Sequence, residues 1–122
     1  MRISEAESIV MQCLWTQAPR TSEEIFAAIG SANGWQEATV KTLLNRLLNK
    51  GALAAERDGR RYLYRPLLKR ADYVHEESKS LLDRLYGGQV SALVAHFSRG
   101  EKLSRREIDE LRALIEEIDR EP

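Results

Sequence analysis

Side chains that can hydrogen-bond to nucleobases gather on one face of a helix-forming segment in the middle of the chain. Opposite the leucines of residues 38–49, this face holds Thr39, Lys41, Thr42, Asn45 and Arg46. In the major groove of DNA, which admits an α-helix, arginine and lysine donate to guanine, asparagine pairs with adenine, and threonine contacts base edges or thymine methyl groups. The face is therefore a candidate DNA-reading surface, although any soluble amphipathic helix also has a polar outer face.

Arginines cluster in the next segment, around a turn signal. The pair Asp58-Gly59 favours a two-residue β-hairpin turn between predicted strands at 53–56 and 60–65. Such a hairpin would present its arginines to DNA phosphates, and these residues are Arg57, Arg60, Arg61 and Arg65. Residues 38–70 hold 9 basic and 2 acidic side chains, a net charge of +7. This shared positive charge favours an anionic partner for the helix and the hairpin together.

The bulk composition narrows the class of protein. The 122 residues carry no formal net charge, which argues against an indiscriminate polyanion binder. The charge is divided, since residues 1–70 hold 11 basic and 7 acidic side chains, whereas residues 71–122 hold 8 and 12. No apolar run approaches the roughly 20 residues that span a bilayer, and the start of the chain lacks the order of a signal peptide. We expect a cytoplasmic protein without a membrane partner.

No combination of residues indicates catalysis or metal binding. The sequence has no glycine-rich phosphate loop, no nucleophile elbow and no acid pair at catalytic spacing. Cys13 is the only cysteine, which excludes an intrachain disulfide and a cysteine-based metal cluster. His75, beside Glu76 and Glu77, lacks the spacing of two ligands on one helix face, and His96 stands alone. We predict no enzymatic activity, no cofactor and no metal site.

Three helices are predicted before the hairpin. Ser4 with Glu7 has the capping-box spacing that starts a helix, and Thr21 with Glu24 repeats it. Gly30 suits the end of the second helix. The third helix has apolar residues at helical spacing and a glycine suited to its end: Val40, Leu43, Leu44, Leu47, Leu48 and Gly51. Three helices followed by a β-hairpin predict a mainly α fold with a winged helix-turn-helix domain over residues 1–69.

Residues 70–122 form a predicted helical arm. Three further helical patterns are separated by Gly87-Gly88 and Gly100, and each has a narrow apolar stripe that needs a partner. The simplest partner is the same region of a second copy, which predicts a symmetric homodimer. The predicted dimerisation residues are Val74, Leu81, Leu82, Leu85, Val90, Leu93, Val94, Phe97, Ile108, Leu111, Leu114 and Ile115.

Five sequence stretches together resemble the penicillinase-repressor family, which includes the methicillin-resistance and copper-responsive repressors of bacteria. They are ISEAESIVMQCLW, WQEATVKTLLNRLLNKGAL, DGRRYLYRP, SLLDRLYGG and LSRREIDEL, and the match covers nearly the whole chain. The resemblance implies a winged-helix domain, a helical dimerisation arm and repression from a palindromic DNA operator. It implies base contacts from Thr39, Lys41, Thr42 and Arg46, and wing contacts from Gly59, Arg60 and Arg61.

The chain departs from the family pattern at three places. Ala38 stands where relatives often have lysine, and the C-terminus lacks the paired cysteines of the copper-responsive members. In antibiotic-responsive members a membrane-linked signalling protease cuts an Asn-Phe bond in the arm, and His96-Phe97 occupies that position here. The substitution argues against this mode of release. Two alternatives remain open at this point: a winged-helix module that binds an acidic protein, and a regulator that senses an effector or a metal through its arm.

Overall fold

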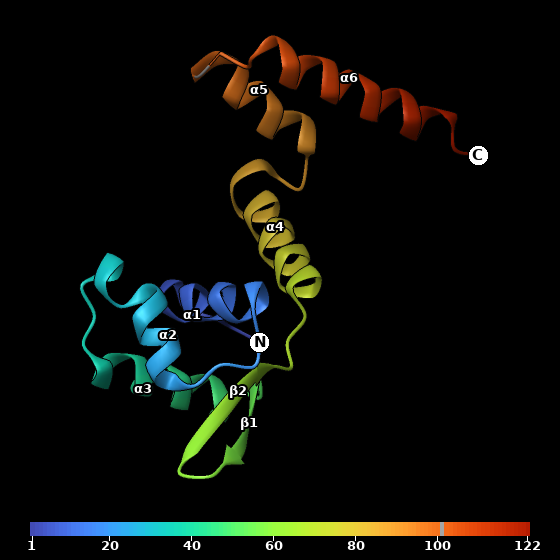
Figure 1. Cartoon of the computed structure of the whole chain (residues 1–122). Helices are drawn as coiled ribbons and strands as arrows, with labels where there is room; N and C mark the ends of the chain where they lie inside the picture. The colour runs from blue at the N-terminus through green and yellow to red at the C-terminus, as the bar shows by residue number, and fades with distance from the viewer. Residues whose placement is uncertain (101) are drawn as a thin grey trace. The chain divides into compact units, whose positions relative to one another are not determined.

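The computed structural model describes residues 1–100 and 102–122, which divide into two units. The first unit, Met1–His75, contains three α-helices, a short 3-10 helix and a hairpin, shown in blue to green in Figure 1. Its elements confirm the predicted winged helix and are α1 (Glu5–Thr16), α2 (Ser22–Ile29), the 3-10 helix η1 (Ser31–Asn33), α3 (Glu37–Asn49), β1 (Leu53–Asp58) and β2 (Arg61–Pro66). The remaining helices are α4 (Arg70–Tyr86), α5 (Val90–Gly100) and α6 (Arg105–Arg120).

Both predicted capping boxes start their helices. In α1 the Ser4 hydroxyl accepts from the Glu7 backbone N–H at 3.1 Å, and the Glu7 carboxylate accepts from the Ser4 N–H at 2.9 Å. Thr21 and Glu24 repeat this exchange in α2, at 3.1 and 3.0 Å. Each cap is worth about 1 kcal/mol, because it satisfies N–H groups that have no partner within the helix. Local sequence therefore determines where both helices begin.

The end of α2 at Gly30 is confirmed, because the helix stops at Ile29 with Gly30 as its C-cap, but the conformation of this glycine differs from the one expected. Gly30 lies in the right-handed helical region rather than the left-handed one, and the chain continues into η1 before it turns at Gly34, whose φ is +67°. A Cβ atom at Gly30 would lie 2.5 Å from the Phe26 ring. Glycine is thus required there by close packing, not by left-handed backbone. Gly51, with φ at +78°, does take the left-handed conformation expected after α3.

The apolar face of α3 lies in the core of the first unit, as predicted. Val40, Leu44 and Leu47 are fully buried, and they belong to one cluster with residues of α1 and α2 such as Leu14 and Ile25. Each such side chain contributes about 1.5–3 kcal/mol when it leaves water. This burial determines which face of α3 points outward.

The hairpin is present, but its turn lies one residue later than predicted. Asp58 pairs with Arg61, so the two loop residues are Gly59 and Arg60 rather than Asp58 and Gly59. Gly59 has φ at +65°, whereas Arg60 does not have a positive φ. A positive φ at only the first loop residue is the pattern of a type II′ turn, which takes glycine at that place. If Asp58 were the first loop residue, as predicted, a residue with a Cβ atom would have to adopt the positive φ.

The second unit, Glu76–Pro122, has no core of its own. Over the described parts of α4, α5 and α6, no side chain is buried. Large apolar side chains are instead exposed, among them Leu85 (63%), Ile115 (64%) and Ile118 (68%). The three helices match the predicted helical patterns of residues 70–122. No helix within the described ranges is long and apolar enough to cross a membrane.

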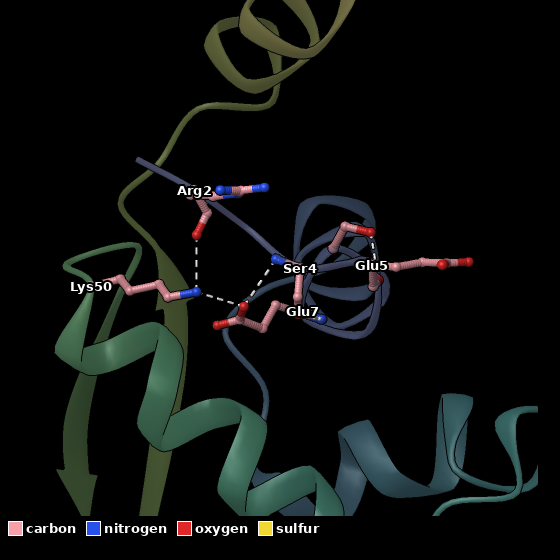
Figure 2. Close-up of polar contacts among 6 residues, drawn as sticks. Arg2, Ser4, Glu5, Glu7 and Lys50 are labelled. Carbon is pink, nitrogen blue, oxygen red and sulfur yellow. Dashed lines mark hydrogen bonds and ion pairs between the residues drawn. The ribbon is translucent and has the colours of Figure 1, made fainter. Parts of the chain in front are cut away.

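An ion pair between a partly exposed lysine and a buried carboxylate joins the start of α1 to the end of α3. The Nζ of Lys50 lies 2.6 Å from Oε1 of Glu7, whose side chain is only 2% exposed, and it also donates to the Arg2 carbonyl at 2.9 Å. Figure 2 shows these contacts, with Oε1 also accepting from the Ser4 N–H. Burial raises the pKa of Glu7, but the bonds from Lys50 and Ser4 outweigh it, so the net pKa lies below the ordinary value.

We predict that Lys50→Met destabilises the first unit in a pH-dependent way. A carboxyl whose folded pKa is lowered stabilises the fold above its unfolded pKa, about 4.3, and loses this contribution as the pH falls. Without Lys50, its hydrogen bond and charge no longer oppose the effect of burial, so the pKa of Glu7 rises from its value in the wild-type protein. We expect a loss of about 2–3 kcal/mol at pH 7 that shrinks to under about 1 kcal/mol near pH 3.5. Urea unfolding between pH 3.5 and 7 measures both, with the exposed Lys69→Met as control. A loss independent of pH would contradict this account.

Candidate nucleic-acid interface

The outward face of α3 carries the predicted base-reading residues. Lys41, Thr42, Asn45 and Arg46 are exposed, and Thr39 is half-buried. They are exposed because the opposite face, which holds Val40, Leu43, Leu44 and Leu47, is buried in the core. The Thr42 hydroxyl donates to the Ala38 carbonyl at 3.0 Å, so its hydrogen is already used within the helix. The remaining polar groups of this face are free to face an external partner.

A polar hollow brings α3 together with the wing and the start of α2. Its volume is about 280 Å³, and its lining residues are Thr21, Ser22, Glu23, Lys41, Asn45, Arg60, Arg61, Tyr62 and Tyr64. Lys41 and Asn45 come from α3, whereas Arg60 and Arg61 come from the wing. Four predicted site residues from two elements therefore border a single concave surface.

Backbone hydrogen bonds hold the wing in this place. The Arg20 N–H donates to the Tyr64 carbonyl at 3.1 Å, and the Tyr64 N–H donates to the Arg20 carbonyl at 2.8 Å. Tyr64 is half-buried against the core, and burial raises its pKa, whereas Tyr62 is 50% exposed. Because Arg20 directly precedes Thr21, the N-cap of α2, this bridge fixes β2 beside the beginning of that helix.

The charges around the hollow are mixed. The N-terminus of α2 carries the partial positive charge of the helix dipole, and Lys41, Arg60 and Arg61 add full charges. Glu23 and Glu24 lie in the same first turn. Bonds from the Thr21 backbone and hydroxyl lower the pKa of Glu24, and the nearby charge of Arg61 adds to this effect. The lowered pKa keeps the Glu24 carboxylate ionised at neutral pH, so an anion in the hollow would be held by the three cations.

The other wing residues have distinct surroundings. The Nε of Arg57 donates to the Gly59 carbonyl at 3.1 Å, so this arginine also stabilises the turn. Arg61 lies 3.7 Å from Asp58, with both side chains more than half exposed. Such an exposed pair contributes little and exchanges readily for another anion. Arg60 lies in the turn itself and is exposed.

Five lining residues were not predicted as site residues, namely Thr21, Ser22, Glu23, Tyr62 and Tyr64, and two of them illustrate why. Ser22 occupies the first position of α2, and Tyr62 lies between the wing arginine Arg61 and Leu63. The sequence signal for Tyr62 was its position in the strand, where it lies on the opposite face from Arg61. The sequence alone did not show which of these two faces is exposed. Ser22 had no local signal, since its place depends on the bridge between Arg20 and Tyr64.

The structure offers little for metal or thiol chemistry. Within residues 1–100 and 102–122, no group of three His, Cys, Asp or Glu side chains could hold a metal ion. Cys13 is 8% exposed in the core, and burial raises the pKa of its thiol despite the opposing charge of Arg20. A raised pKa leaves little reactive thiolate at neutral pH.

The predicted dimerisation residues divide by exposure. The exposed ones are Val74, Leu81, Leu85, Val90, Phe97, Leu114 and Ile115, while Leu82, Leu93, Val94, Ile108 and Leu111 are half-buried. Val74 belongs to the first unit and the others to the second. A hollow of about 380 Å³ between α5 and α6 is lined largely by apolar residues, including Leu93, Phe97 and Leu111. Ile118, which is 68% exposed, extends the apolar stripe of α6.

Comparison with known proteins agrees with this architecture. The family model described as penicillinase repressor matches residues 3–117. The chain is 34% identical over 116 residues to the penicillinase repressor of Bacillus licheniformis, covering 95% of this chain and 91% of that one. It is 32% identical to the methicillin resistance regulatory protein MecI of Staphylococcus aureus, covering 93% and 92%.

A solved structure shows the same likeness in three dimensions over part of the chain. The monomeric form of Bacillus licheniformis BlaI, in complex with the blaP half-operator, is 33% identical, with a TM-score of 0.53. The match covers 60% of this chain and 89% of that one. The family match over nearly the full length confirms the resemblance found in the sequence. This chain belongs to the penicillinase repressor family.

Proposed function

We propose that this protein is a transcriptional repressor that binds a palindromic DNA operator as a homodimer. The observation that carries the proposal is the shared hollow, in which Lys41 and Asn45 of α3 meet Arg60 and Arg61 of the wing. One elongated anion could contact both elements at once. Membership of the penicillinase repressor family supports the proposal, as does the solved complex of the relative BlaI with a half-operator.

In this proposal α3 lies in the major groove and the wing lies on the phosphate backbone. Lys41, Asn45 and Arg46 are the donors to base edges, while Thr39 and Thr42 supply methyl contacts. Arg60 and Arg61 neutralise phosphates, and Arg57 with Gly59 shapes the turn that presents them. The phosphate contacts determine how the protein lies on the duplex, and the base contacts select the sequence.

In this proposal the arm joins the two copies of the dimer. Its helices expose leucine, isoleucine and phenylalanine side chains without burying any within the described residues. Exposed apolar area of this kind marks an interaction surface, and a two-fold dimer places the same stripe on both partners. Two copies of α3 would then enter successive major grooves about 34 Å apart, which matches a palindrome.

Binding would repress transcription by occupying the promoter, and no chemical step is required of the protein. His96-Phe97 lies in α5, where the family resemblance places a cleaved Asn-Phe bond. Release of repression is therefore expected to use a different bond or a different signal. Selection from a randomised double-stranded library tests the whole proposal. Enrichment of one palindrome supports it, and the absence of any enriched sequence contradicts it.

We predict that Arg46→Ala weakens binding to the selected palindrome by about 1–3 kcal/mol and relaxes the base preference at one position of each half-site. The reason is the loss of a side chain that donates to a base edge. Fluorescence anisotropy against the selected palindrome and its single-base variants measures both effects. Arg106→Ala, which removes an arginine on the outer face of α6, is the matched control and should bind normally. An unchanged base preference in the Arg46 variant would exclude Arg46 from base reading.

Arg60→Ala should behave differently, because a phosphate contact carries no sequence information. We expect weaker binding to all duplexes alike and a slope of log affinity against log salt that is lower by about 0.9. Titrations between 50 and 300 mM salt, a range of about sixfold chosen to resolve that slope, give the result for specific and random DNA. A loss confined to the selected palindrome would show that Arg60 reads a base instead.

Ile115→Glu should prevent dimerisation, because the association would bury an unpaired carboxylate among apolar side chains. We expect the dimer dissociation constant to rise at least about 100-fold. Sedimentation velocity across a concentration series measures this change. Ala113→Glu introduces the same side chain at an exposed position two residues away, on the opposite side of α6, and should remain dimeric. A dimeric Ile115 variant would move the interface away from α6.

A further inference from the structure

Side chains at the end of α1 and the start of α4 form a small anchor within the first unit. The indole Nε1 of Trp15 donates to the Leu68 carbonyl at 2.9 Å, across 53 positions of sequence. The ring of Tyr73, in the first turn of α4, lies 5.5 Å from the Trp15 ring at an interplanar angle of 41°. Both aromatic residues and Leu68 are half-buried against the core.

The connection between β2 and α4 forms hydrogen bonds to the winged helix through both its N–H groups and a carbonyl. The N–H groups of Leu67 and Leu68 both donate to the carbonyl of Ala52, at 2.8 and 3.1 Å, and Ala52 is fully buried. The Leu68 carbonyl is taken by Trp15. Only residues 67–69 separate Pro66 from Arg70. This short segment is therefore fixed to the winged helix rather than being a flexible linker.

We infer that Trp15 and Tyr73 are positioning residues that set the spacing of the two DNA half-sites. The inference rests on the proposed function, because it needs a dimer on a palindrome. α4 continues from this anchor for 17 residues in total, and the later residues belong to the unit that carries the dimerisation stripes. The direction in which α4 leaves the winged helix then determines where each reading helix lies relative to its twin.

Geometry gives the size of the effect. With a rise of about 1.5 Å per residue, α4 is about 25 Å long, so a change in direction of about 10° at its base moves its far end by about 4 Å. That displacement is close to the distance of about 3.4 Å between neighbouring base pairs. A loosened anchor should therefore broaden the preferred half-site spacing by about one base pair, without altering how one domain reads its half-site.

The test compares single half-sites with palindromes of altered spacing. The probes are the palindrome selected by the wild-type protein, the same DNA cut to one half, and versions with one or two base pairs added or removed at the centre. Trp15→Phe keeps an aromatic ring but loses the N–H donor, and Tyr73→Ala removes the second ring. Tyr73→Phe is the matched control, because it retains the ring that packs on Trp15.

For the wild-type protein we expect at least a tenfold preference for the selected spacing over its neighbours. In Trp15→Phe and Tyr73→Ala this preference should fall to threefold or less, while half-site affinity stays within twofold of wild type and thermal unfolding remains cooperative. Tyr73→Phe should retain the full preference. Variants that keep the wild-type spacing preference, or that lose half-site affinity in equal measure, would overturn the inference. If instead the wild-type protein bound half-site and palindrome equally, the proposed dimeric repressor itself would fail.

Discussion

Burial of one face of α3 is the constraint on which the rest of the first unit depends. Val40, Leu44 and Leu47 are fully buried, and adjacent helical positions differ by about 100° around the axis. Turning α3 by a single position would move these side chains toward water, at a cost of about 1.5–3 kcal/mol each. The polar face is thus oriented by apolar packing and not by its own contacts. Its side chains can serve recognition because the fold does not depend on them.

The wing is positioned by a different kind of interaction. A two-stranded hairpin alone is marginal in water, and half of the strand residues here are exposed. The exchanged backbone bonds between Arg20 and Tyr64 add a minimal third strand, and half-buried Tyr64 adds packing. Because Arg20 precedes the N-cap Thr21, the same short segment begins α2 and fixes β2. The concave surface therefore combines an element held by side-chain burial with one held by main-chain hydrogen bonds.

The features predictable from sequence were those determined by neighbouring residues. The boxes at Ser4 and Thr21, the leucine face of α3 and the left-handed Gly51 each follow from spacing within one or two turns. The register of the hairpin turn, by contrast, depends on whether Asp58 belongs to the loop or pairs with Arg61, which local sequence does not determine. The role of Gly30 depends on its packing against the ring of Phe26. The contacts Glu7–Lys50 and Trp15–Leu68 join residues far apart in the sequence, so no periodic pattern of residue types predicts them. The mixed charge of the hollow was hidden for the same reason.

The contrast between the two units links recognition to assembly. The first unit has a complete core and can hold the proposed reading surface in a single copy, whereas the arm exposes the apolar side chains that a core would need. In the proposed dimer, association both buries those side chains and stabilises the arm helices, so arm folding depends on protomer concentration. Once two copies are joined, binding of one half-site raises the effective concentration of the second reading helix at the other. The affinity of the dimer for the palindrome then exceeds the affinity of one domain for a half-site, without any additional base contact. This gain requires that the segment from Leu67 to Tyr73 place the two copies of α3 at the spacing of the half-sites.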